Sequence, residues 1–137
     1  MAFVSSFRHH VRSYELDPYG HVNNAVHMQW LEHGRSRLLQ DKGFDFTNVE
    51  DRWGVRFVTA SVKIDYKASL LLDDDVEVTT TVARFGRTSV TLQQQIVRRD
   101  PDGSRTLAGA GQCVIVFTDP TMTQPVPIPD GFKELYA

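Results

Sequence analysis

One short stretch of this sequence, residues 17–24, reads Asp17-Pro18-Tyr19-Gly20-His21-Val22-Asn23-Asn24 and marks a turn that runs into a helix. Asp in the first place, Pro in the second and Gly in the fourth are typical of a type I turn. An Asn at 23 or 24 suits the N-cap, because its side chain can accept a hydrogen bond from an unpaired amide of the first helical turn. The stretch therefore predicts a turn at 17–20 and a helix that begins near Asn24.

The residues after this turn predict one long helix, from Asn24 to Lys42. Helical spacing is followed by the apolar-face residues Val26, Trp30, Leu31, Gly34 and Leu38. Gly43 stands where a helix commonly ends. At ~1.5 Å per residue the helix is roughly 28 Å long, which is enough to cross a small sheet. Glu32 and Arg35 are three residues apart, so we expect them to form an ion pair on the helix surface.

The rest of the chain predicts mainly strands. We expect a first strand over Phe7–Glu15, a connecting loop over Phe44–Gly54, and a clearly alternating strand over Val58–Tyr66. In that strand one face would carry Val58, Ala60, Val62, Ile64 and Tyr66. Further strands are predicted at 76–83, 90–96 and 106–117, with turns at 85–87 and 100–103. Gly109 and Gly111 favour a bend or a close backbone contact, and the tail is irregular with one helical turn at 131–136.

These elements predict a single α+β domain over residues 1–137, with the long helix packed on one face of an antiparallel meander sheet. One helix covers only one face of a sheet and neither edge. We therefore expect association with another subunit through an edge or through the other face.

Composition narrows the function classes. The chain has 137 residues, 41% of them hydrophobic and 23% charged, and its formal net charge is −2. This balance gives no electrostatic footprint for nucleic acid or an anionic membrane. Cys113 is the single cysteine, so no intrachain disulfide is expected and a reducing compartment is favoured. With no secretory signal pattern and no apolar run near the ~20 residues of a membrane helix, we expect a cytoplasmic protein.

Asp17 is the residue in this sequence that is best placed for chemistry. The sequence contains no Walker glycine loop, no Gly-x-Ser-x-Gly elbow and no cysteine pair, and its histidines are not spaced as a ligand set, so we expect no metal or cofactor. Asp17 precedes a helix N-terminus, whose free amides and positive dipole can stabilise a carboxylate, a phosphate or a developing oxyanion. Asp17 could act there as general base or nucleophile toward an acyl carbon. The alternative is that Asp17 only begins a turn and the Asn pair only caps a helix.

The string from Asp17 to Ala25, continued by Trp30, Glu32 and Arg35, resembles the signature of the hotdog-fold acyl-CoA thioesterases. The similar branch is the 4-hydroxybenzoyl-CoA thioesterase-like family, which includes the bacterial long-chain acyl-CoA thioesterases. The resemblance extends over nearly the whole chain, including residues 11–12 and the strand that ends in Ile64-Asp65-Tyr66 with its following loop. In one departure His27 stands where relatives usually have Tyr or another aromatic residue.

The resemblance implies a hotdog fold, a long helix wrapped by an antiparallel sheet, with subunits paired into a continuous sheet and active sites at the dimer interface. It implies a thioester hydrolase that converts a fatty or aromatic acyl-CoA, or an acyl-carrier-protein thioester, to the free acid and thiol. Asp17 would be the catalytic carboxylate, the amide near Asn24 would polarise the thioester carbonyl, and Gly20 would let chain and substrate approach closely. A homodimer or a homotetramer is expected.

Further residues are candidates for substrate binding. The substrate-binding candidates are His21, Val22, Asn23, His27, Val58, Thr59 and Ala60, of which residues 58–60 would line the acyl channel. Those for the CoA phosphates, all near strand ends, are Lys67, Arg84 and Arg87. Each also has a structural interpretation, as a loop residue, as sheet packing or as a solvated surface charge.

Two other functions remain open at the level of sequence. A dehydratase or hydratase of the same fold would need a histidine with an acidic partner, and here only His21 with Asp17 fits that requirement. A non-catalytic module would bind acyl-CoA and leave it intact.

Overall fold

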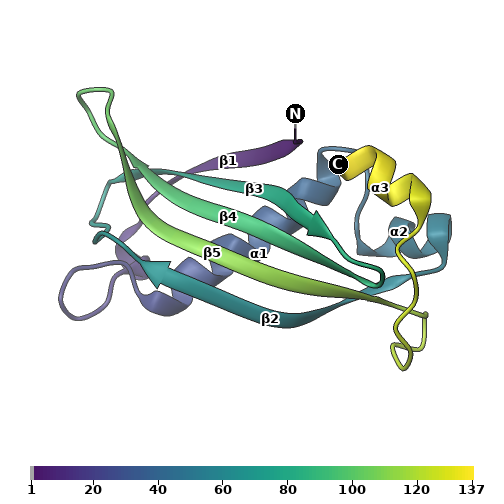
Figure 1. The fold of residues 1–137 in the computed structure, drawn as a ribbon. Helices are drawn as coiled ribbons and strands as arrows, with labels where there is room; N and C mark the ends of the chain where they lie inside the picture. The colour runs from purple at the N-terminus through teal and green to yellow at the C-terminus, as the bar shows by residue number, and fades with distance from the viewer. Residues whose placement is uncertain (1) are drawn as a thin grey trace.

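The computed structural model describes residues 2–137 and shows a long helix, α1 (Asn24–Gln40), lying across one face of a five-stranded antiparallel sheet (Figure 1). The strands are β1 (Val4–His10), β2 (Arg56–Tyr66), β3 (Asp75–Phe85), β4 (Ser89–Arg99) and β5 (Arg105–Thr118). Their order in the sheet is β1-β3-β4-β5-β2. This confirms the predicted α+β architecture. The sheet is a meander only over β3, β4 and β5, because β1 takes the free edge of β3 and β2 pairs with β5 instead.

Helix α1 begins where the sequence predicts and ends at Gln40, two residues before the predicted end. Asn23 is its N-cap, and the side chain accepts a hydrogen bond from the Ala25 amide at 2.9 Å. The apolar stripe is buried against the sheet, as the helical spacing requires: Trp30, Leu31, Gly34 and Leu38 are all buried.

Small residues allow α1 to lie close to the sheet. A Cβ on Gly34 would stand 2.9 Å from both the Gln94 amide nitrogen and the Thr80 hydroxyl, and a Cβ on Gly111 would stand 3.0 Å from Leu31. The close backbone contact predicted at Gly111 is therefore confirmed. The Gln94 side chain, which is buried, donates to the Leu31 carbonyl at 2.8 Å across this contact.

In the described part of the chain, Arg35 and Glu32 do not form the expected ion pair. The Arg35 guanidinium donates to the Gln94 side-chain oxygen at 3.2 Å instead. Arg35 is thus part of the helix–sheet contact, which sequence spacing along the helix alone could not reveal.

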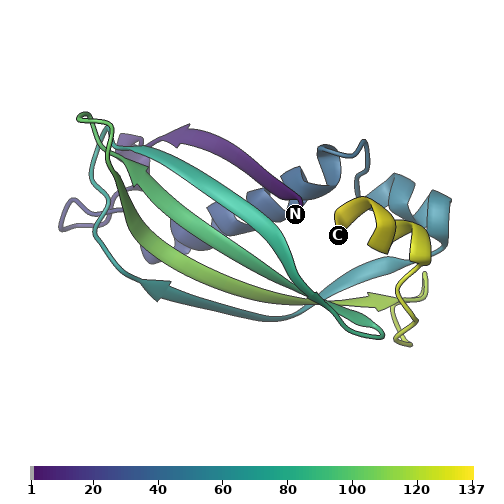
Figure 2. The same ribbon diagram turned by 45° about the horizontal axis from the view of Figure 1, so that its top comes forward.

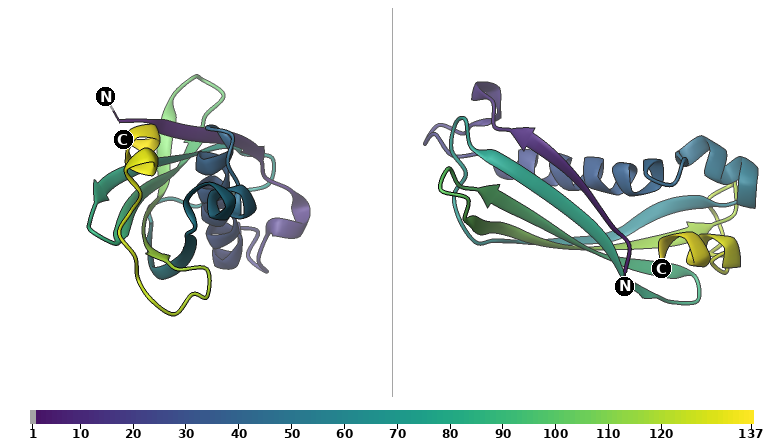
Figure 3. Two further views of the ribbon diagram at one scale, coloured as in Figure 1. Left: turned by 90° about the vertical axis from the view of Figure 1, so that its right-hand side faces the viewer. Right: turned by 90° about the horizontal axis from the view of Figure 1, so that it is seen from above.

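The hydrophobic core has two parts along α1. The first half of the helix belongs to one part, which draws on the start of the chain and on the strands β3 and β4. This part includes Val11, Val22, Trp30, Leu31, Leu70, Val76, Val78 and Ile96. The second half packs with two short helices, α2 (Phe46–Trp53) and α3 (Asp130–Tyr136), which lie together beyond the C-terminal end of α1 (Figures 2 and 3). The buried Tyr136 hydroxyl donates to the Leu39 carbonyl at 2.9 Å and fixes α3 there.

Two local predictions were wrong. The region 44–54 was expected to be a loop but contains α2, which Asp45 caps by accepting hydrogen bonds from the amides of Thr47 and Asn48. The first strand ends at His10 and not at Glu15, because residues 13–15 form a short 3₁₀ helix, η1 (Ser13–Glu15). Both elements are short, and their ends are set by capping and burial more than by periodicity.

A β-bulge changes which side chains of β2 face the helix. The pairing of β2 with β5 shifts between Thr59 and Ser61, so Ala60 is an extra residue without a partner across the ladder. Before the bulge Phe57 pairs with the core residue Phe117, so Val58 points to the opposite face of the sheet. The uninterrupted alternation predicted from Val58 to Tyr66 is therefore wrong on the N-terminal side of the bulge.

Candidate active site

The loop over residues 16–22, named here the Asp17 loop, is a tight hairpin between η1 and α1. Leu16 and Val22 form a bridge at its base, and the Asp17 amide donates to the His21 carbonyl at 2.7 Å. The Gly20 amide donates to the Asp17 carbonyl at 3.0 Å, which confirms the predicted turn. Gly20 has φ +81°, a left-handed conformation that favours glycine.

The backbone of this loop orients the Asp17 carboxylate. The oxygen Oδ1 accepts hydrogen bonds from the amides of Tyr19 at 2.9 Å and His21 at 3.1 Å. Within residues 2–137 the other oxygen, Oδ2, receives no hydrogen bond. One oxygen is thus fixed, while the other can accept a proton or attack a carbon.

The first turn of α1 leaves one amide free. The Ala25 amide donates to the Asn23 side chain, and the amides of Val26 and His27 donate to the Asn23 carbonyl at 2.9 and 3.3 Å. The Asn24 amide has no acceptor in the described part of the chain. It is therefore available as a donor to an oxyanion at the positive end of the helix.

Asp17 and Asn24 line the same cavity, which has a volume of about 280 Å³. Its walls are the Asp17 loop, the first turn of α1, the end of β2 and the segment after β2. The complete lining is Asp17, His21, Val22, Asn24, His27, Tyr66, Lys67, Ala68, Ser69 and Leu70. The Val22 amide donates to the Leu70 carbonyl at 2.9 Å and joins the two sides of the cavity.

His27 presents a hydrogen-bond acceptor in this cavity. Its side chain is buried, and its Nδ1 donates to the Asn23 carbonyl at 3.1 Å. Burial lowers the pKa of His27, although the hydrogen bond to Asn23 opposes that effect. The lowered pKa favours the neutral ring, in which the proton is on Nδ1 and the lone pair on Nε2. Within residues 2–137 this Nε2 atom has no hydrogen-bond partner. The His27 ring packs edge-on against the Tyr66 ring, with 5.1 Å between the two centroids.

Neither a metal cluster nor a membrane span is present in the described residues. Within residues 2–137 no group of three or more His, Cys, Asp or Glu side chains is placed to hold a metal ion. The described helices are all too short or too polar to cross a membrane.

The sequence matches the family model of the thioesterase-like superfamily over residues 11–135, which includes the Asp17 loop and strands β2 to β5. The chain belongs to this superfamily. Among its relatives, the long-chain acyl-CoA thioesterase FadM of Escherichia coli K12 is 30% identical over 94 residues, 68% of each chain. The acyl-CoA thioester hydrolase YbgC of Escherichia coli O6:H1 is 28% identical over 125 residues, 90% of each chain.

The fold is that of the hotdog thioesterases. The solved structure of 4-hydroxybenzoyl-CoA thioesterase from Pseudomonas sp. strain CBS-3 matches 96% of this chain and 98% of its own, with a TM-score of 0.86. The two sequences are 17% identical over this match, so the likeness establishes the fold of this superfamily member and not its substrate.

The structure of this superfamily member brings together only some of the predicted site residues. His21, Val22, His27 and Lys67 line the cavity with Asp17 and Asn24, whereas Gly20 shapes the loop and Asn23 caps the helix. Residues 58–60 lie elsewhere: Thr59 lines a separate apolar cavity of about 180 Å³ under the second half of α1, Val58 faces away from α1, and Ala60 lies at the bulge.

Two predicted phosphate contacts lie far from the cavity within one chain. Arg84 and Arg87 are at the β3–β4 hairpin, whereas the Asp17 loop is at the opposite end of the sheet (Figure 1). The cavity residues that were not predicted are Tyr66, Ala68, Ser69 and Leu70. The resemblance of the strand ending in Tyr66 was a signal for the first of these, but nothing in the sequence indicates that residues 66–70 face residues 17–27.

Proposed function

We propose that this protein hydrolyses acyl-CoA thioesters to a free acid and CoA. The observation that carries the proposal is that Asp17 and Asn24 line one cavity. Within residues 2–137, one carboxylate oxygen of Asp17 and the amide of Asn24 have no hydrogen-bond partner. A base or nucleophile and an oxyanion donor are the two groups that acyl transfer requires. The thioesterase relatives support the same reaction.

In the proposed reaction the thioester carbonyl oxygen accepts a hydrogen bond from the Asn24 amide. Asp17 then either removes a proton from an attacking water or attacks the carbonyl carbon itself. The carbon–sulfur bond breaks, the CoA thiolate takes up a proton, and the acid is released. In the nucleophilic route water then hydrolyses an anhydride between Asp17 and the acyl group.

The position of the cavity suggests how the substrate lies. His21, Asn24 and Lys67 are exposed, whereas His27 and Leu70 are buried. We therefore place CoA at the exposed rim, with Lys67 as a candidate phosphate contact, and the acyl group toward His27. The hydratase alternative has less support, because the contact between His21 and Asp17 is through the His21 backbone amide and not through its imidazole.

We also propose that a second copy of the chain completes the site through β2. This strand of eleven residues is an edge of the sheet, and Thr59, Ala60 and Ser61 in its middle are exposed. An unprotected edge strand can pair with a copy of itself. Antiparallel pairing about its centre would bring residues 58–60 of one copy toward the Tyr66 end of the other. Residues 58–60, which lie outside the cavity of their own chain, could then contribute to the cavity of the second copy.

Thiol release tests the proposed function. The purified protein is assayed with short-chain, long-chain and aromatic acyl-CoAs, and Asp17→Asn is compared with wild type on the best substrate. We expect turnover to fall by about 10² or more, the size of a lost general base. The fold should persist, because Asn keeps a side-chain oxygen that accepts from Tyr19 and His21. Asp51→Asn, an exposed carboxylate on α2, is the control. Near-full activity in Asp17→Asn would return Asp17 to a purely structural role.

A further inference from the structure

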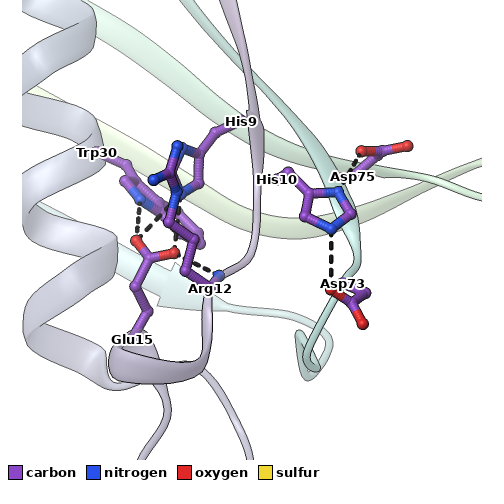
Figure 4. A network of polar contacts seen from close by, with 7 residues as sticks. All are labelled: His9, His10, Arg12, Glu15, Trp30, Asp73 and Asp75. Atoms are coloured by element: carbon purple, nitrogen blue, oxygen red, sulfur yellow. Dashed lines mark hydrogen bonds and ion pairs between the residues drawn. The ribbon is translucent and has the colours of Figure 1, made fainter.

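Glu15 is a buried carboxylate just before the Asp17 loop, with an exposed fraction of 7%. It lies between β1 and α1, where three donors converge on it (Figure 4). The His9 ring nitrogen Nε2 is 2.8 and 3.1 Å from the two carboxylate oxygens, the Arg12 amide donates at 2.8 Å, and the Trp30 indole donates at 3.2 Å. Glu15 therefore joins a strand, the 3₁₀ turn and the helix.

The charged form of Glu15 is favoured in this position. Burial raises the pKa of the carboxyl, but the hydrogen bonds from His9, the Arg12 amide and Trp30 together outweigh it and lower the pKa overall. An ionised carboxylate accepts hydrogen bonds only, and all of its neighbours here can donate. The donors thus fix the carboxylate from several directions.

The backbone of Glu15 is hydrogen-bonded to the N-cap of α1 and lies two residues before Asp17 in the chain. Its carbonyl accepts from the amide of Asn23, the N-cap of α1, at 2.9 Å. Asp17 follows two residues later, and its amide closes the loop onto His21 at 2.7 Å. A displacement of Glu15 would therefore change both the position of the Asp17 carboxylate and the direction of the Asn24 amide.

We propose that Glu15 is a positioning residue that holds Asp17 and the free Asn24 amide in register for attack on the thioester. This inference rests on the proposed function. Rates of acyl transfer depend steeply on such geometry, and a displacement of about 1 Å can cost about 10² in rate. Glu15 itself lines no part of the cavity and acts through Asp17 and Asn24.

Glu15→Gln is the decisive variant, because it keeps the shape of the side chain. It replaces one acceptor oxygen by an NH₂ group, which must then face a donor. We expect kcat to fall by about tenfold to 10², with KM within about threefold, when the assay is run well below the unfolding temperature of the variant. Asp75→Asn is the matched control: it removes a carboxylate that contacts His10 on the exposed, opposite side of β1 (Figure 4).

Hydrogen–deuterium exchange of residues 16–23 gives a readout that is independent of activity. We expect faster exchange in Glu15→Gln than in wild type or Asp75→Asn. If Glu15→Gln lowers the unfolding temperature but leaves kcat unchanged, or if exchange in residues 16–23 is unchanged, Glu15 is a stability element only and the proposal is wrong.

A second variant covers the case in which Glu15→Gln does not fold. His9→Phe keeps a ring against Trp30, from which His9 is 5.3 Å away between centroids, and removes one donor to Glu15. In His9→Phe we expect a smaller decrease in kcat and a smaller increase in the exchange of residues 16–23. The absence of both changes would overturn the proposal. A wild-type protein that releases no thiol from any acyl-CoA would refute the proposed function, while the exchange measurement would still decide whether Glu15 orders the loop.

Discussion

Replacement of Asn24 by proline removes the proposed oxyanion donor with little change elsewhere. Proline is favoured at the first position of a helix, because that amide has no partner within the helix. The residue before a proline must be extended, and Asn23 already is, with φ −63° and ψ 140°. The Asn24 carbonyl, which lies 3.5 Å from the Tyr66 hydroxyl, is kept. The backbone is therefore already suited to Asn24→Pro.

The structure separates the role of this amide from that of the side chain. The Asn24 side chain is exposed and makes no hydrogen bond within the described residues, so Asn24→Ala should keep most of the turnover. Loss of a single oxyanion donor costs about 10²–10³ in kcat, or about 2.7–4 kcal/mol of transition-state stabilisation. We expect Asn24→Pro to lose activity by this factor.

The assay is free-thiol release at saturating acyl-CoA, with circular dichroism and thermal unfolding to confirm that both variants are folded. Asn24→Pro at wild-type kcat would show that another group polarises the carbonyl. If Asn24→Ala were as inactive as Asn24→Pro, the side chain and not the amide would carry the role, and the argument from the helix end would fail at this residue.

Two further predictions concern assembly and pH. If β2 pairs with a second copy, light scattering at micromolar concentration will show a dimer or a dimer of dimers. The variant Ser61→Pro in β2 will shift the protein toward the monomer. A monomeric wild-type protein would contradict both the pairing and a shared site. Burial lowers the pKa of His27 below 6.5, so its contribution to stability is complete above pH 6.5 and is lost as the pH falls toward the folded-state pKa. The unfolding free energy of wild type relative to His27→Phe, measured in urea, should therefore decrease from pH 7 to pH 5, and a constant difference would be inconsistent with a buried neutral His27.

The sequence alone determined the features that depend on neighbours within a few residues. The Asp17–Gly20 turn, an Asn cap at 23 or 24 and the start of α1 were all predicted, because turn and cap hydrogen bonds connect residues two to four positions apart. The β3–β4 hairpin and the turn at 100–103 were predicted for the same reason. These signals placed Asp17 next to the Asn24 amide before any tertiary contact was known.

Short elements and strand faces were less predictable. Helix α2 is only eight residues long, which is too short to be stable by its own helical hydrogen bonds. It is stabilised mainly by the packing of its apolar residues near α3. In β2 the alternation of side chains is correct only after Ala60, because one extra residue at a bulge reverses the face of everything before it. No local pattern indicates where such a bulge will occur.

Only the tertiary structure decided what surrounds the Asp17 loop. Tyr66, Ser69 and Leu70 complete the cavity from a segment more than forty residues later in the chain, which the pairing of β2 with β5 places beside α1. Glu15 meets Trp30 because α1 packs along β1, and its charge is stabilised by donors from both elements. The sequence determines the position of the proposed reacting groups through local hydrogen bonds, whereas the cavity and its support depend on how distant segments pack to bury the apolar face of α1.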